Sequence, residues 1–367
     1  MSEPRTYPID QSPLFRLASK KRLALLLGIG VADLKLLCDM QQHNFKRWEL
    51  GQRERDKLIG LPVKKKRSIQ QPKAALHAVH KRIALLLGRI QKPEFVYSAT
   101  KKRSYVENAF QHRRDQPCVK VDIKEFYPHV KFGRVRRFFL DQLECSVDVA
   151  HMLAILCCVD GALPTGSAVS PVLSYFSCAP MFAAIEALAQ RRGLVFTLYV
   201  DDMVFSGEAV DMVFANDVRV LLKNRGFVGH KIKCYAARDV KVVTGVAVRA
   251  DFVDLPFSRK GRIRKTEAAF AVRTDPEELR ILGRALIGQY REAERIKPGI
   301  KGKAASVEAR LRSLGLMGPA AQTGRRKPRL KQGATVFDEL RAQRARLLAQ
   351  RAQPTKPNSS DESTAAA

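Results

Sequence analysis

Residues 196–205 read Phe-Thr-Leu-Tyr-Val-Asp-Asp-Met-Val-Phe and place two adjacent carboxylates, Asp201 and Asp202, between two short runs of β-forming residues. The pattern predicts a tight hairpin with both aspartates at its tip. Neighbouring like charges make each other harder to ionise, and a divalent cation removes that cost. Because Mg²⁺ prefers carboxylate and phosphate oxygens, the tip is a candidate magnesium site. A solvated surface turn is the alternative interpretation of these residues.

A third carboxylate lies in a comparable setting earlier in the chain. Residues 118–123 read Cys-Val-Lys-Val-Asp-Ile and predict a short strand that ends at Asp122. Neighbouring strands would bring Asp122 beside Asp201 and Asp202. Three carboxylates at strand ends suit a two-metal site, in which ions roughly 3.5–4 Å apart hold the attacking and leaving oxygens of an in-line displacement. Alone, Asp122 would more often be a surface turn residue, and the hairpin favours the metal site.

Between these segments, residues 163–171 form a loop rich in Pro, Gly and Ser. We expect the loop to open a long apolar helix from Val172 to about Ala189, with Ser170 as its cap and Pro171 in its first turn. Gly166 would let the backbone approach a ligand closely. An ordinary loop-to-helix junction is the alternative interpretation.

The order and spacing of these segments are similar to the successive palm motifs of reverse transcriptases, with Asp122 and Phe126-Tyr127 first, residues 163–171 next and residues 199–202 last. Gly226-Phe227 followed by Lys233 resembles the next palm motif. Residues 67–72 resemble the fingers motif in which a basic residue, here Arg67, meets the incoming triphosphate. The similarity spans about residues 15–320.

Two further motifs resemble those of retron reverse transcriptases in particular. Residues 108–112 match an Asn-Ala-x-x-His pattern, and residues 243–245 match a Val-Thr-Gly signature where the primer grip begins. The chain departs from the family at Thr165, Tyr175, Val200 and His230, although all three carboxylates are present. The resemblance implies an enzyme that copies a cognate structured non-coding RNA into a branched RNA–DNA molecule. It also implies dNTP substrates and, in anti-phage systems, a separate effector protein.

The resemblance assigns roles residue by residue. Two Mg²⁺ ions would be held by Asp122, Asp201, Asp202 and the Ile123 carbonyl. Tyr127 would exclude a ribose 2′-OH, although plain packing is its alternative role, and Lys233 would protonate or screen the leaving pyrophosphate. The remaining expected contacts are with the incoming nucleotide, through Arg67, Thr165 and Gly166, and with the RNA, through Asn108, His112, Thr244 and Gly245.

Composition agrees with a nucleic-acid partner. The chain carries 66 Lys and Arg against 36 Asp and Glu, a formal net charge of +30 that favours binding to a polyanion. A membrane surface would also attract this charge, but the sequence lacks an apolar run of membrane-spanning length and a secretory signal. The cysteines form no Cys-x-x-Cys pair, which predicts buried thiols in a reducing cytoplasm.

The resemblance implies an α+β fold with the right-hand polymerase architecture. Its parts would be N-terminal helices and fingers over 1–92, a palm with an antiparallel sheet over 93–255, a helical thumb over 256–318 and a basic, largely disordered tail over 319–367. In the thumb, Asp275-Pro276 predicts a helix start, and Leu279, Leu282, Leu286 and Tyr290 recur on one helix face. We also expect two short helices broken near Gly28, and a short helix near 336–348.

Two alternatives remain at this point. One is another bacterial reverse transcriptase, of the maturase-like or abortive-infection type, that primes from a protein or works without a template. The other is a non-catalytic RNA-binding protein that keeps the palm as a scaffold. The intact set of three carboxylates favours an enzyme, because a scaffold has no need of metal ligands.

Overall fold

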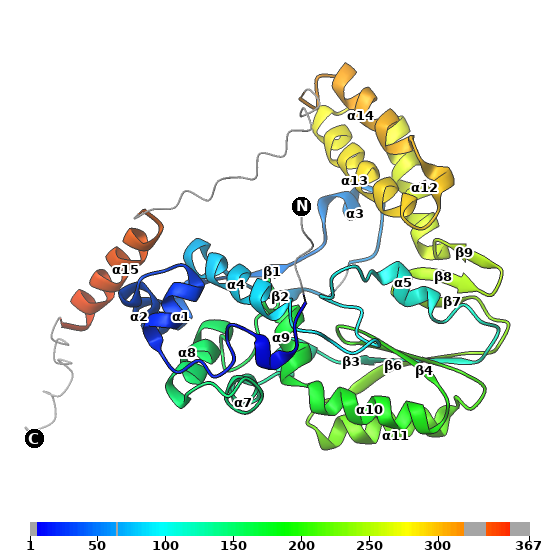
Figure 1. Cartoon of the computed structure of the whole chain (residues 1–367). Helices are drawn as coiled ribbons and strands as arrows, with labels where there is room; N and C mark the ends of the chain where they lie inside the picture. The colour runs from blue at the N-terminus through cyan, green and yellow to red at the C-terminus, as the bar shows by residue number, and fades with distance from the viewer. Residues whose placement is uncertain (1–5, 64, 319–334, 353–367) are drawn as a thin grey trace, which may run out of the picture.

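The structure, a computed structural model, describes residues 6–63, 65–318 and 335–352. It is a mixed α and β fold in which every sheet is antiparallel (Figure 1). Strand order is β1-β2 in the first sheet, β4-β5-β3-β6 in the central sheet and β7-β8-β9 in the third. The predicted α+β class is therefore confirmed.

The central sheet consists of β3 (Cys118–Ile123), β4 (Val195–Tyr199), β5 (Asp202–Ser206) and β6 (Gly229–Tyr235). Its side chains alternate between two cores. Val121 and Met203 belong to the large core together with residues of α10 (Ala179–Arg191) and α11 (Met212–Asn224). Val204 faces the other way, toward a smaller core that includes Val243. The predicted hairpin is confirmed, because β4 and β5 pair directly across residues 200 and 201.

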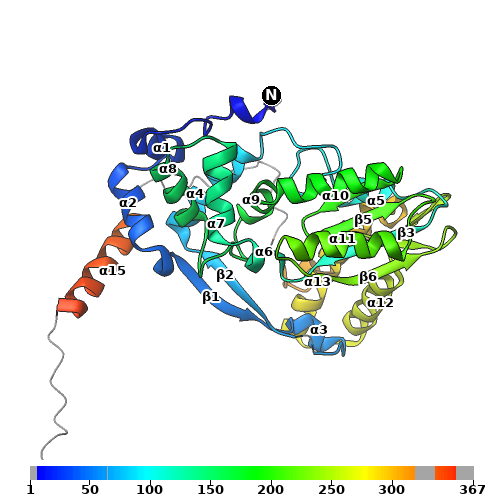
Figure 2. The ribbon, with the colours of Figure 1, turned by 90° about the horizontal axis from the view of Figure 1, so that it is seen from below.

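The N-terminal part packs helices around one end of the large core (Figure 2). The break predicted near Gly28 is confirmed, since Gly28 has a left-handed φ of 73° between the first two helices. The helices of this region are α1 (Lys20–Leu27), α2 (Val31–Asp39), α4 (Ala74–Leu87), α6 (Phe126–His129), α7 (Phe132–Arg137) and α8 (Val147–Cys157).

The predicted single helix over residues 172–189 is wrong. Two helices, α9 (Ser170–Ser177) and α10, are bent by 67° at Cys178. Pro180 lies in the first turn of α10, where its ring and missing amide hydrogen are tolerated, whereas inside one continuous helix they would break it. No single described helix is long and apolar enough to cross a membrane; α9 and α10 reach that length only as this bent pair.

A long hairpin reaches from the N-terminal part to the C-terminal helices. Its strands are β1 (Phe45–Leu50) and β2 (Arg67–Pro72), and the connection holds α3 (Glu54–Leu58). Ile59, at the end of α3, is buried in an apolar cluster with Leu282 and Leu286 of α13. The tip of the hairpin is therefore anchored to the C-terminal helices, beneath which it lies in Figure 2.

The C-terminal part combines β7 (Lys241–Val243), β8 (Val246–Arg249) and β9 (Phe252–Asp254) with α12 (Phe257–Val272), α13 (Pro276–Glu294) and α14 (Lys303–Ser313). The predicted start of α13 is confirmed, because the Asp275 carboxylate accepts the Glu278 amide at 2.8 Å. The four apolar residues expected on one face are buried. A small helix, α5 (Tyr105–Phe110), packs on β8.

The predicted short helix of the tail is confirmed and is longer than expected, as α15 (Thr335–Ala352). It packs on the N-terminal helices, where Arg341 pairs with Asp33 and Arg344 with Asp39. The rest of the tail expected to be disordered, residues 319–334 and 353–367, lies outside the described residues.

Candidate active site

Strand register brings the three carboxylates together. Asp122 on β3 lies directly opposite Asp202 on β5, on the sheet face that looks toward β7. The Ile123 amide donates to the Asp201 carbonyl at 3.0 Å, which ties the end of β3 to the hairpin tip. Val200 adopts φ 63°, a left-handed conformation that costs a β-branched residue about 1–2 kcal/mol. The tight turn therefore stores strain next to both aspartates.

Burial and mutual repulsion make these carboxylates hard to ionise. Burial raises the pKa of Asp201 to about 6, and the nearby Asp122 carboxylate adds to the shift. Burial also raises the pKa of Asp202, although the Lys120 ammonium opposes this shift. Buried like charges that remain side by side are costly, and such perturbed pKa values gather at functional sites.

Two lysines and one histidine contact the carboxylates. The Lys120 Nζ lies 2.9 Å from Asp202 Oδ2. His230 Nε2 lies 3.3 Å, and Lys231 Nζ 3.5 Å, from Asp122 Oδ2. Lys231 reaches Asp122 because the β3–β6 register shifts there and Lys231 takes φ 51°. A bulge of this kind re-aims a side chain at the edge of a site.

The donor set suits a divalent cation. Asp202 Oδ1 is buried and has no hydrogen-bond partner among the described residues. An orphaned buried carboxylate oxygen is expensive unless a ligand completes it. Within the same described ranges, no three His, Cys, Asp or Glu side chains are already gathered as a metal cluster. A bound ion would therefore have to bring the three carboxylates closer together and take Asp122 away from its contacts with His230 and Lys231.

Tyr127 lies beside these carboxylates on α6. Burial raises the pKa of its hydroxyl, and the charges of Asp201 and Tyr199 raise it further. The ring also packs against Phe126, with 6.0 Å between ring centroids. The Tyr127 side chain therefore lies at the edge of the sheet that carries the three aspartates. The resemblance to reverse transcriptases implied that Tyr127 contacts the sugar of an incoming nucleotide.

The loop at 163–171 contacts β2. The Thr165 hydroxyl donates to the Ser68 carbonyl at 2.9 Å, and the Gly166 amide donates to the Gln70 carbonyl at 3.1 Å. A Cβ on Gly166 would lie 2.8 Å from that carbonyl oxygen, so the close approach that requires glycine here is made by β2. Ser170 is not the helix cap; its buried hydroxyl donates to the Pro164 carbonyl at 2.7 Å.

The two retron-like motifs meet at the turn between β7 and β8. Thr244 and Gly245 both have positive φ, 43° and 82°, as a two-residue type I′ turn requires. The Thr244 hydroxyl donates to the Tyr105 carbonyl at 2.6 Å and accepts from Asn108 Nδ2 at 3.5 Å. Asn108 is fully buried, so any part that it has in RNA recognition acts through this turn.

His112 is likewise fully buried, and it bridges two strands of the central sheet. Its ring nitrogens lie 2.7 Å from the Ser206 hydroxyl and 2.8 Å from that of Thr197. Burial, then the charge of Lys241, lowers its pKa to about 3, so His112 is a neutral hydrogen-bonding residue. Any effect of His112 on RNA binding would also be indirect.

Arg67 and Lys233 are exposed and make none of the contacts just described. Arg67 begins β2 opposite Leu50, and Lys233 pairs with Lys120 across β3 and β6. On β6, the lysine that contacts a carboxylate is Lys231, whose partner is Asp122. Sequence reasoning missed Lys120, His230 and Lys231 as site residues; the alternation of Lys120 with Asp122 on one strand face was the available signal.

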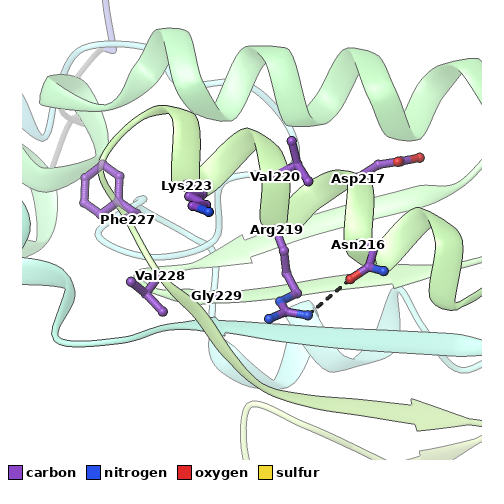
Figure 3. A pocket seen from close by; sticks show the side chains of 8 residues that line it. All are labelled: Asn216, Asp217, Arg219, Val220, Lys223, Phe227, Val228 and Gly229. Carbon is purple, nitrogen blue, oxygen red and sulfur yellow. Dashed lines mark hydrogen bonds between the residues drawn. The ribbon is translucent and has the colours of Figure 1, made fainter.

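A surface pocket of about 500 Å³ lies apart from the carboxylates. Figure 3 shows side chains of α11, such as Arg219 and Lys223, and the segment 227–229 around it. None of the three aspartates lines it. The candidate site is therefore not this pocket. It is identified by its charged side chains and by the strand register that brings them together.

Comparisons with known proteins agree with this site. The chain is 26% identical over 208 residues to the retron Ec86 reverse transcriptase of Escherichia coli. The matched region covers 55% of the chain and 65% of that protein. It is a relative of the retron reverse transcriptases. The retron Mx162 enzyme of Myxococcus xanthus is 26% identical over 295 residues, covering 70% of the chain and 59% of the relative. The retron Ec48 enzyme of Escherichia coli is 24% identical over 282 residues, covering 72% and 66%.

These relatives are named as reverse transcriptases, which are RNA-directed DNA polymerases. The chain spans about half to two thirds of the length of the curated relatives it matches. No family model matches the chain.

Proposed function

We propose that the protein is an RNA-directed DNA polymerase of the retron type. It copies a cognate structured non-coding RNA into a branched RNA–DNA product in the cytoplasm, within an anti-phage system that includes a separate effector protein. The named relatives support the reaction class. The observation that carries the proposal is the register that sets Asp122 opposite Asp202 at the strained hairpin, with one buried carboxylate oxygen left without a partner among the described residues.

We infer the right-hand polymerase layout from the similarity to retron reverse transcriptases. The helices and hairpin of residues 1–92 serve as fingers, residues 93–255 as palm and residues 256–318 as thumb. The carboxylates lie on the palm face toward β7, and the anchored hairpin joins the fingers to the thumb. A primer–template duplex would lie between these parts, against the carboxylate edge.

The three aspartates with the Ile123 carbonyl are the groups that would hold two Mg²⁺ ions. When bound, such ions lower the pKa of the primer hydroxyl and neutralise charge on the leaving pyrophosphate. Tyr127 selects the sugar by occupying the space of a 2′-OH. Arg67 meets the triphosphate, while Thr165 and Gly166 join the nucleotide site to the fingers through β2. Lys233 acts as an electrostatic screen for pyrophosphate.

Recognition of the cognate RNA depends on the turn that Asn108, Thr244 and Gly245 build. The side chains of Asn108 and Thr244 are tied into one hydrogen-bonded unit. Gly245 lies against Arg259 of α12 so closely that a Cβ added to the glycine would meet the guanidinium Nη2 at 2.9 Å. The turn therefore contacts the proposed thumb through this arginine. General affinity for RNA follows from the net charge of +30 and carries no selectivity.

The test is primer extension on an RNA template with Mg²⁺ and dNTPs. Replacing Asp201 and Asp202 together by Ala should abolish synthesis, because the metal-binding edge is lost, while the fold and RNA binding persist. The matched control is Asp217→Ala, which removes an exposed carboxylate on α11 that pairs with Arg192. Synthesis retained by the purified double variant would refute the proposed function.

A further inference from the structure

Among the described lysines and arginines, Lys120 makes the shortest contact with one of the three carboxylates and has little exposure. Lys120 and Asp122 are two residues apart on β3 and so share a sheet face. Lys120 pairs with Val204 across β3 and β5, which makes Asp202 its diagonal neighbour, within reach of a long side chain. The Lys120 side chain is only 16% exposed, and Asp202 is 21% exposed.

Lys120 contacts only one of the two carboxylate oxygens of Asp202. Its Nζ donates to Oδ2 at 2.9 Å, whereas Oδ1 is buried without a partner among the described residues. A carboxylate held by one oxygen presents the other in a fixed direction. The same Nζ donates to the Val242 carbonyl at 3.2 Å, so β7 fixes the ammonium from the opposite side.

The partners of Asp122 are held less firmly. Lys231 is 68% exposed and lies 3.5 Å from its carboxylate oxygen, and His230 makes its contact at 3.3 Å. An exposed ion pair of this kind contributes little and is readily exchanged. Lys120, with two acceptors and little exposure, is built to stay in place when a divalent ion arrives.

We propose that Lys120 is a positioning residue of the polymerase site: it holds Asp202 by Oδ2 so that Oδ1 faces the metal, and it ties this carboxylate to β7. The inference rests on the proposed function. Because β7 leads into the Thr244–Gly245 turn, Lys120 also connects the carboxylates to the turn that we assign to RNA and primer contacts. The ammonium repels a divalent cation, so correct orientation is obtained at the expense of metal affinity.

The experiment compares Lys120→Met, which removes charge and donors at similar length, with Lys120→Arg, which keeps the charge. The matched control is Lys260→Met, because Lys260 pairs with the buried Asp254 at 2.7 Å, away from the three carboxylates. Three quantities are measured on the full chain: Mn²⁺ binding without nucleic acid, by electron paramagnetic resonance; kcat and KM for dNTP on an annealed primer–template; and the melting temperature.

Lys120→Met should bind Mn²⁺ at least about threefold more tightly, because a positive charge a few ångströms from the ion is gone. Its kcat should fall about 10–100-fold, the usual range for residues that orient metal ligands, with KM for dNTP unchanged. Lys120→Arg should restore the parental Mn²⁺ affinity. Lys260→Met should lower the melting temperature and leave Mn²⁺ affinity and kcat unchanged.

Unchanged or weaker Mn²⁺ binding by Lys120→Met, or a kcat equal to that of the parent, would overturn the inference. If Lys120→Met does not fold, Lys120→Gln, which keeps a donor for Val242, carries the same expectations. The two proposals fail separately. A parent without RNA-templated synthesis contradicts the polymerase function, whereas an active parent with an indistinguishable Lys120→Met variant contradicts only the role of Lys120.

Discussion

Two aspartates with little exposure, each paired with a lysine, differ in how completely their carboxylate oxygens are hydrogen-bonded. Asp254, at the end of β9, accepts the Leu255 amide through Oδ1 at 2.7 Å and Lys260 through Oδ2 at 2.7 Å. Burial alone would raise the pKa of Asp254, but these hydrogen bonds outweigh it and the pKa is lowered. At Asp202, burial prevails over Lys120, the pKa is raised and Oδ1 has no partner within the described part of the chain.

Asp254 is a buried charge that stabilises the fold, whereas Asp202 is a charge at a candidate functional site. Asp254 joins β9 to α12 and, through Lys297 at 3.4 Å, to the end of α13. Its charge is compensated within the chain. The negative charge of Asp202 is only partly compensated, and Asp122 and Asp201 lie beside it. This arrangement lowers the stability of the fold, and a folded protein keeps it only where a ligand offsets the loss.

The largest expected effect is on activity. Asp202→Asn should reduce RNA-templated DNA synthesis at least about 100-fold, because losing a metal ligand removes several kcal/mol of transition-state stabilisation. Asp254→Asn should lower the free energy of unfolding by about 3 kcal/mol, since it leaves two lysines without their buried partner. Primer extension and urea unfolding on both variants measure the contrast. Equal activity losses in the two variants would erase the distinction.

A second prediction concerns the residue that borders the carboxylate edge. Tyr127→Ala should lower the preference for dNTP over rNTP in kcat/KM by about tenfold or more, because the exclusion of a 2′-OH is steric. The raised pKa keeps the Tyr127 hydroxyl neutral, so the preference should not change across neutral pH. Steady-state incorporation of both nucleotides gives the ratio. An unchanged ratio in an active variant would return Tyr127 to a packing role.

Stability against pH should differ in sign between the two regions. The pKa of Asp201 is raised to about 6, so in metal-free protein its ionisation destabilises the fold above that pH, and the cost disappears as pH falls below it. The pKa of Asp254 is lowered, so its contribution is present at neutral pH and is lost in acid, below its ordinary pKa.

In EDTA near neutral pH, Asp201→Asn should therefore raise the melting temperature by a few degrees, and Asp254→Asn should lower it. A pH of about 4.5 lies between the ordinary and the raised pKa of Asp201 and above the ordinary pKa of Asp254, so the gain from Asp201→Asn should shrink there while the loss from Asp254→Asn persists. Thermal unfolding of both variants at the two pH values is the measurement. If Asp201→Asn lowered the melting temperature at neutral pH, the ionised Asp201 would not be destabilised by burial and by repulsion from Asp122.

The smallest expected effect lies at the turn that Lys120 reaches through β7. Thr244→Val removes the hydroxyl that donates to the Tyr105 carbonyl, which should cost about 1 kcal/mol of stability. Synthesis on the cognate structured RNA should fall several-fold more than extension of a DNA primer on unrelated RNA. Parallel assays on the two templates test this, and equal losses would make the turn a purely structural element.

Local signals predicted the elements well. The runs of β-forming residues on either side of Asp201 and Asp202 correctly indicated a hairpin, and Asp275-Pro276 correctly marked the start of α13. Both signals act between residues close in sequence. The long apolar run after residue 171 also carried a local signal for the bend at Cys178, which the prediction of one helix overlooked: Pro180 would break a continuous helix.

What sequence could not supply was the set of contacts that depends on strand register. The diagonal contact of Lys120 with Asp202 follows only once β3 is aligned with β5, and the contact of Lys231 with Asp122 requires a bulge in β6. Gly166 was expected to approach a ligand, whereas its close neighbour is β2, a strand far away in sequence. Each of these contacts is set by tertiary packing, which local propensity does not encode.

The central claim is that Asp122 and the hairpin aspartates form one metal-dependent site for DNA synthesis. The most direct measurement is Mg²⁺-dependent dNTP incorporation on an RNA template by the parent and by Asp122→Asn, with folding checked by melting temperature. The parent should incorporate dNTP robustly and lose this activity in EDTA, and a folded Asp122→Asn variant should lose at least about 100-fold. Parental incorporation by Asp122→Asn would contradict the central claim.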